Sequence, residues 1–155
     1  MSLMLPLSSV ADEDWWFSPD FCEFSVEFPT AYEEKQVVVG GELGAGATAQ
    51  VGSSAFFAAE CWSYEEQPPL EQFAQHMEML ATQRGVSVSS VVVDRSSTIG
   101  GQVVLTGVVN AGGETLHITT ISSVGQRTRL DLTMVDNEIV SREKLAFRNS
   151  ITLKN

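Results

Sequence analysis

One stretch, Pro68 to Gly85, constrains the fold of this chain more than any other, because its helical period, start signal and end signal agree. Apolar residues recur there at intervals of three and four, which places them on one side of an α-helix. They are Leu70, Phe73, Ala74, Met77, Leu80 and Ala81. Pro69 suits the first helical position, and Gly85 can adopt the left-handed conformation that ends a helix. We therefore expect a helix over residues 69 to 84 that packs its apolar side against another element.

Alternating sequence patterns on both sides of this helix predict β-strands. Apolar and polar residues alternate from Cys22 to Phe28, which is the period of a half-buried strand. Further strands are expected over residues 35–43, 54–64, 86–94, 102–109, 114–123 and 127–135. The last three are joined by short turns, which predicts an antiparallel meander. A final helix is expected over residues 138–147, capped by Asp136 or Asn137, with a short tail after it.

Small residues fill the segment between two of these strands, where glycine stands at positions 40, 41, 44, 46 and 52. A phosphate-binding loop would need a strand before the glycines and a helix after them. Here a strand follows, and no Lys-Ser or Lys-Thr pair completes a nucleotide-binding motif. We therefore predict a mobile hairpin loop over residues 40–52 and no cofactor.

Length and charge limit the classes of function. A chain of 155 residues is most simply one domain with its own core. Twenty acidic against nine basic side chains give a net charge of -11, which repels nucleic-acid phosphates. The densest basic cluster, Arg142, Lys144 and Arg148, is interrupted by Glu143. We expect no nucleic-acid partner, and no membrane span because no apolar run reaches 18 residues.

Candidate catalytic and metal-binding residues do not stand in recognisable patterns. His76 and His117 have no other ligand type at metal-binding spacing, so no metal site is predicted. None of the many serines stands in a G-x-S-x-G or S-x-x-K motif. We therefore predict no catalytic residues and a protein that is not an enzyme.

The N-terminal segment, residues 1–20, bears on the location of the protein. Leu3 to Val10 is apolar and then small, and Ser9 and Ala11 stand where a signal peptidase requires small residues. The segment resembles the remnant of a signal peptide, which predicts a periplasmic or secreted protein. The alternative is a disordered N-terminus of a cytoplasmic protein.

Two cysteines, Cys22 and Cys61, stand at inward-facing positions of predicted strands. They can form a disulfide if their Cα atoms lie within about 7 Å. Two buried free thiols are slightly favoured while the compartment is undecided, and a disulfide is favoured outside the cytoplasm.

Five aromatic residues are the best candidates for a surface that binds another protein or a second copy of the chain. They are Trp15, Trp16, Phe56, Trp62 and Tyr64. Aromatic side chains are favoured at interfaces because they bury much area at low entropic cost. We expect a groove or a dimer surface near the first and third predicted strands.

The order of elements resembles that of the PsbP-like fold family, over residues 22–153. The resemblance rests on Phe24 to Pro29, the helix described above, the Gly100-Gly101 turn, and Phe147 to Ile151. Bacterial relatives in this family include DcrB-type lipoproteins and effector chaperones of type VI secretion. The resemblance implies an α+β domain over residues 21–155. Its architecture would be an α/β/α sandwich, with a mostly antiparallel sheet of about six strands and helices on both faces.

The resemblance also implies action by binding or assembly. Our first hypothesis is a non-enzymatic protein-binding domain outside the cytoplasm. The second is a cytosolic chaperone for a secreted effector. The third is a small-molecule binder or enzyme on an NTF2-like cone, with one deep pocket lined by polar groups.

Overall fold

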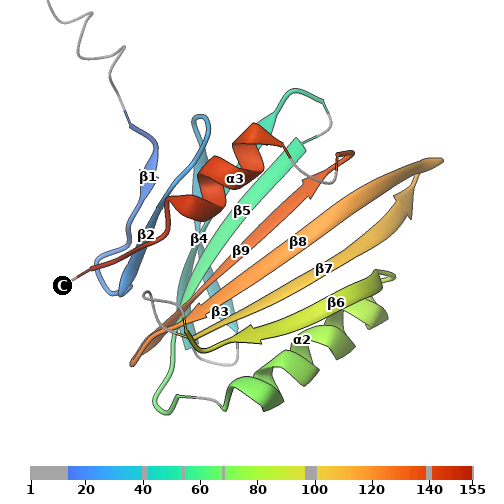
Figure 1. Ribbon diagram of the computed structural model, residues 1–155. Helices are drawn as coiled ribbons and strands as arrows, with labels where there is room; N and C mark the ends of the chain where they lie inside the picture. The colour runs from blue at the N-terminus through green and yellow to red at the C-terminus, as the bar shows by residue number, and fades with distance from the viewer. Residues whose placement is uncertain are drawn as a thin grey trace, which may run out of the picture.

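The computed structural model describes residues 14–39, 42–53, 55–67, 69–96, 101–138 and 141–154. Its main element is a seven-stranded antiparallel sheet with the strand order β3-β4-β5-β9-β8-β7-β6 (Figure 1). The strands are β3 (Glu33–Val39), β4 (Glu42–Val51), β5 (Ala55–Ser63), β6 (Ser87–Asp94), β7 (Gly101–Ala111), β8 (Glu114–Val124) and β9 (Thr128–Asp136). The predicted meander is confirmed, since β7, β8 and β9 pair in sequence with short turns between them, and β6 pairs with the other edge of β7.

A second layer covers one face of this sheet, which we call the packed face. It contains a three-stranded sheet of β1 (Trp16–Phe17), β2 (Phe24–Glu27) and β10 (Thr152–Leu153), together with helix α3 (Arg142–Asn149). In Figure 1, α3 crosses in front of β5, and β1, β2 and β10 lie to its left. Their buried side chains form one core with alternate residues of β4, β5, β8 and β9. The ring of Phe147 joins the layers, with its centroid 4.8 Å from that of Phe28 and 5.3 Å from that of Phe57.

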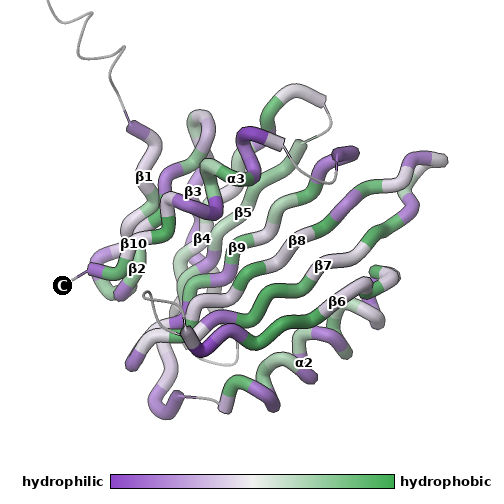
Figure 2. Tube along the Cα trace, viewed as in Figure 1, coloured by the Kyte–Doolittle hydropathy of each residue, from purple (hydrophilic) through white to green (hydrophobic). Residues whose placement is uncertain are grey.

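Helix α2 (Leu70–Gln83) lies on the opposite face, which we call the groove face, beside β6 and β7. The predicted helix and its apolar side are confirmed, because Phe73 and Ala74 pack with Val103 and Val124. Hydrophobic stretches of β6 and β7 run alongside α2 in Figure 2. Gly85 follows the helix with φ +88°, the left-handed conformation expected at its end.

The predicted α/β/α sandwich is wrong, because the fold is mostly β. The described residues contain two helices and ten strands, and the layer on the packed face is a three-stranded sheet beside the eight-residue α3. The tail of the chain is part of the reason. Instead of ending freely after a helix, it returns as β10 and pairs with β2.

The predicted glycine-rich loop is also wrong, because residues 42–51 form β4, paired on both sides. The glycines make room for a neighbouring side chain. A Cβ atom added to Gly44 would lie 2.7 Å from the six-membered ring of Trp62, so only glycine lets the indole lie against the strand. Gly40 and Gly41 lie outside the described residues.

The final helix begins later than predicted, at Arg142 rather than residue 138. Its cap is Ser141, whose hydroxyl accepts a hydrogen bond from the backbone N–H of Lys144. Asp136 instead accepts from the N–H of Glu138 and ends β9. Phe147 is the buried apolar residue of this helix.

A disulfide between Cys22 and Cys61 connects the two layers, with Cα atoms 6.1 Å apart. It joins the segment before β2 to the C-terminal part of β5. Residues 1–11, for which a signal-peptide remnant is predicted, lie outside the described residues, whereas Trp16 and Phe17 of the N-terminal segment pair with β2. In the part of the chain that is described, no helix is long and apolar enough to cross a membrane.

Candidate functional site

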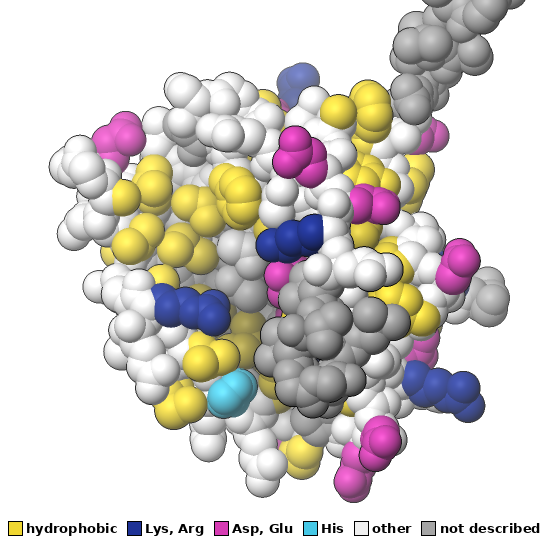
Figure 3. All heavy atoms as spheres, turned by 180° about the vertical axis from the view of Figure 1, so that it is seen from behind, with side chains coloured by type: hydrophobic (Ala, Val, Ile, Leu, Met, Phe, Trp, Pro, Cys, Tyr) yellow, Lys and Arg dark blue, Asp and Glu magenta, His cyan; other side chains and the backbone are white. Residues whose placement is uncertain are grey.

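A groove of about 480 Å³ lies between α2 and the groove face of the sheet. Hydrophobic side chains gather on this side of the molecule, with basic side chains among them (Figure 3). One wall is apolar and comes from α2 and the strands nearest to it, with Phe73, Met77, Leu80, Ala81, Leu105, Val109 and Ile118. The floor is polar and comes from β5, β9 and β8, with Glu60, Thr120, Ser122, Arg129, Asp131 and Thr133. His76 of α2 and Arg84, the residue that caps its C-terminal end, are exposed and lie at the rim.

Strand register produces the polar floor. Glu60 lies opposite Asp131, and Asp131 lies opposite Ser122, so the three side chains form one row across β5, β9 and β8. Thr133 and Thr120 form the next row. Because side chains two residues apart share a face of a strand, the polar residues project to the side where α2 lies.

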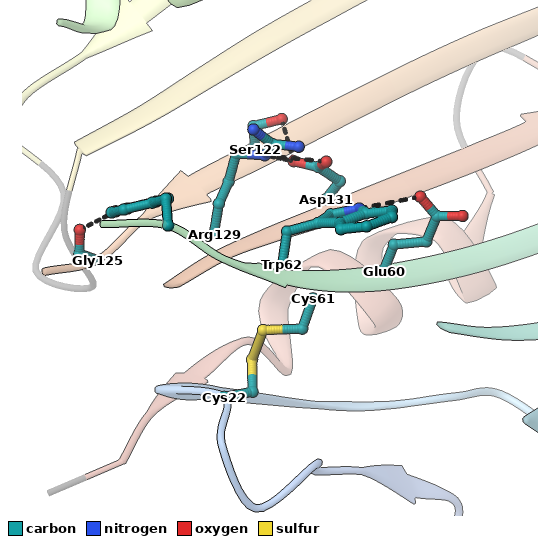
Figure 4. Close-up of polar contacts among 9 residues, drawn as sticks. Cys22, Glu60, Cys61, Trp62, Ser122, Gly125, Arg129 and Asp131 are labelled. Carbon is teal, nitrogen blue, oxygen red and sulfur yellow. Dashed lines mark hydrogen bonds and ion pairs between the residues drawn. A yellow bond between two sulfur atoms is a disulfide. The ribbon is translucent and has the colours of Figure 1, made fainter. Parts of the chain in front are cut away.

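Three side chains of this floor, Arg129, Asp131 and Ser122, are bonded to one another. Nε of Arg129 donates to both carboxylate oxygens of Asp131, at 2.9 and 3.1 Å, and the hydroxyl of Ser122 donates to one of them at 2.7 Å (Figure 4). The guanidinium also lies over the ring of Phe73, 4.7 Å from its centroid. Both charged side chains are largely shielded, with 24% and 21% exposure.

The pKa of Asp131 is raised above its ordinary value. Burial is the largest cause, and it outweighs the lowering effects of Arg129 and Ser122, while the negative charge of Glu60 raises the pKa further. Glu60 and Asp131 therefore act on each other electrostatically across the two strands.

Glu60 has a different environment from Asp131. Its carboxylate accepts a hydrogen bond from the indole N–H of Trp62 at 3.3 Å. Trp62 and Glu60 lie on the same side of β5 as the Arg129–Asp131 pair, and the disulfide lies on the other side (Figure 4). The ion pairs of the described residues are Arg129–Asp131 and Arg95–Glu71, and neither includes Glu60.

Tyr64 lies next to the groove but has a structural role. It packs against the α2 core, and its hydroxyl donates to the carbonyl of Gly125 in the turn between β8 and β9. Burial and the nearby Glu23 raise the pKa of Tyr64 to about 12, although Arg129 lowers it. The hydroxyl therefore keeps its proton at neutral pH.

The structure separates the five predicted partner-binding aromatics. Trp62 and Tyr64 lie beside the groove, and Phe56 lies on the same face toward the other end of β5, 41% exposed. Trp15 packs against the core of the packed face, and Trp16 lies on β1. The set therefore does not form one surface.

The polar floor was missed at the sequence level. Glu60, Ser122 and Asp131 come from three strands, and no short motif links them. A usable signal was the polar alternation of Arg129, Asp131 and Thr133, on a strand otherwise apolar at every second position. Such a pattern inside a buried meander indicates a polar face that is partly covered.

Neither a protein-family model nor a curated protein matches this sequence. The resemblance to PsbP-like proteins therefore stays a prediction. Within the described ranges, no three His, Cys, Asp or Glu side chains gather as metal ligands would.

Proposed function

We propose that this protein is a non-enzymatic binding protein that holds a small amphipathic molecule in the groove between α2 and the sheet. The observation that carries the proposal is the groove itself, about 480 Å³ with an apolar wall and a polar floor. Ligand pockets are typically about 300 to 1,000 Å³, mostly apolar, with a few polar groups that orient the ligand. The third of the sequence-based hypotheses, a small-molecule binder, thus has more support than a protein-binding aromatic surface.

The bonding of the floor favours binding over catalysis. A general base must have a carboxylate that is ready to accept a proton from a substrate. The carboxylate of Asp131 instead receives hydrogen bonds from Arg129 and Ser122. These bonds hold it as a fixed part of the floor.

The disulfide supports a location outside the cytoplasm. Disulfides persist in oxidising compartments such as the periplasm and are rare in the reducing cytosol. The Cys22–Cys61 bond therefore favours the periplasmic or secreted alternative over the cytoplasmic one.

Titration with N-phenyl-1-naphthylamine, an apolar probe whose fluorescence rises when it leaves water, tests the groove. Ala81 lines the groove, whereas its neighbour Thr82 is exposed on α2. We expect the wild type and Thr82→Phe to bind the probe, and Ala81→Phe to lose binding because the new ring fills the groove. Equal binding by both variants, with unchanged melting temperatures, would contradict the proposal.

A second candidate function is self-association through the exposed aromatic residues near β1. Trp16 and Phe21 are each 39% exposed, and large apolar side chains at such positions are common in interfaces. Sedimentation equilibrium of the wild type and of Trp16→Ser/Phe21→Ser tests it. A wild-type mass equal to that of one chain, at every concentration, would rule out the dimer.

A further inference from the structure

The charged end of the groove holds more negative than positive charge on its floor. Arg129 is the basic residue of the floor, and both carboxylate oxygens of Asp131 already accept from its Nε. Glu60 faces the same place and receives only the N–H of a neutral indole. Two carboxylates therefore share one guanidinium on the floor, since the basic Arg84 lies at the exposed rim, just after the end of α2.

Trp62 adds a second feature that favours a cation at this place. One face of its ring lies against Gly44, which holds the indole in position beside Glu60. The face of an aromatic ring attracts cations, and tryptophan does so most strongly. Glu60 and the half-buried Trp62 therefore place a carboxylate and an indole side by side at this end of the groove.

The groove becomes apolar away from this end. Ile118 lies four residues along β8 from Ser122, a distance of roughly 14 Å at the usual rise of a strand. Leu105 and Val109 of β7 flank this path, and Leu80 of α2 covers it. An apolar tail that starts near Glu60 can therefore lie between the helix and the sheet.

We propose that the groove selects molecules with an ammonium head and an apolar tail, with the ammonium bound by Glu60 beside Trp62. This inference rests on the proposed function and specifies the chemistry of its ligand. Its positive charge neutralises the second carboxylate of the floor, Glu60, which Arg129 does not pair. Its N–H groups donate hydrogen bonds to that carboxylate. The tail lies along Leu105 and Ile118.

Three ligands of equal chain length test the head group: octylammonium, 1-octanol and octanoate. Each is measured by displacement of N-phenyl-1-naphthylamine at pH 7 and 150 mM NaCl, where long-range attraction to the acidic protein is screened. We expect octylammonium to bind about tenfold more tightly than 1-octanol, as suits a charge-assisted hydrogen bond, and octanoate to bind most weakly. Glu60→Gln is expected to abolish the preference, so that octylammonium binds that variant no more tightly than 1-octanol does.

The control is Glu78→Gln, which removes the same charge from an exposed position of α2 outside the groove lining. It is expected to keep the preference. If Glu60→Gln does not fold, Trp62→Leu keeps the carboxylate, removes the ring, and should weaken octylammonium more than 1-octanol.

The outcomes separate this inference from the proposed function. If the probe does not bind, or Ala81→Phe binds it normally, the groove is not a binding site and both ideas fail. If probe and 1-octanol bind but octylammonium binds no better, the ammonium head is wrong while the groove stands. If Glu60→Gln and Glu78→Gln lose the preference for octylammonium equally, that preference comes from the net charge of the protein, and the role of Glu60 is overturned.

Discussion

Reduction of the Cys22–Cys61 disulfide is expected to destabilise the protein by about 4 kcal/mol. The two cysteines are separated by 39 residues in sequence. In the chain-entropy model, the closing of a loop of that length lowers the entropy of the unfolded chain by about 13 cal/mol/K, or about 4 kcal/mol at 25 °C. Native domains have unfolding free energies of about 5 to 15 kcal/mol, so this loss is a large share of the total.

The assay is urea unfolding followed by tryptophan fluorescence, for the oxidised protein, the reduced protein and the double variant Cys22→Ala/Cys61→Ala. With a denaturant slope of about 2 kcal/mol per molar urea, reduction should lower the midpoint by roughly 2 M. Comparison of oxidised with reduced protein isolates the cross-link, because both contain the same atoms in the core apart from two hydrogens. The double variant should lie slightly below the reduced protein, since it also loses the two buried sulfur atoms.

Two results would refute this reasoning. One is alkylation of both cysteines in unreduced, unfolded protein from an oxidising host, which would show that no bond forms. The other is an unchanged urea midpoint after reduction that mass spectrometry shows to be complete. In that case, the cross-link would not lower the entropy of the unfolded chain by the amount that the chain-entropy model assumes.

Three further predictions concern single side chains. Burial alone would raise the pKa of Glu23, but hydrogen bonds from the turn at 126–128 lower it below the ordinary 4.5. This stabilisation is present above pH 4.5 and disappears as pH falls through the folded-state pKa. Glu23→Gln should therefore lower the melting temperature at pH 7 and make it fall less steeply in acid. Melting temperatures of wild type and variant that fall equally steeply below pH 4.5 would contradict this. Gly44→Val should displace the indole of Trp62, seen as a red shift of fluorescence emission, and an unchanged spectrum would argue against the packing. Phe73→Ala should cost about 3 kcal/mol in urea unfolding, since Phe73 of α2 is only 9% exposed and packs against the sheet, and a loss below about 1 kcal/mol would place the ring outside the core.

Helices and strands with a strong local sequence pattern were predictable. A strand whose residue types are set by packing against a residue far away in the sequence was not. Helix α2 follows from its own period and end signals, and the alternation around Phe24 identifies β2. The sequence predicts a loop for most of β4 because glycine disfavours strands in isolation. Its glycines are there because the indole of Trp62 needs the space, which no local pattern reveals.

The architecture depended on long-range pairing in the same way. The tail was recognised as a short segment after a helix, but its pairing with β2 involves residues over 120 positions apart, as in Thr152 opposite Ser25. That pairing makes the second layer a sheet and overturns the predicted sandwich. The cysteines were recognised as candidates, yet only the packing of β5 beneath the β2 layer brings them together.

The sequence by itself determined the amphipathic helix, the antiparallel meander and the strongly acidic charge, because each depends on residues close together in the chain or on composition alone. Tertiary structure alone decided the groove. Its floor joins Glu60, Ser122 and Asp131 through strand register, and its wall depends on the face of the sheet on which α2 packs. A binding site made of neighbours in space has no signature in a linear pattern, because register and layer packing follow from the free energy of the whole fold.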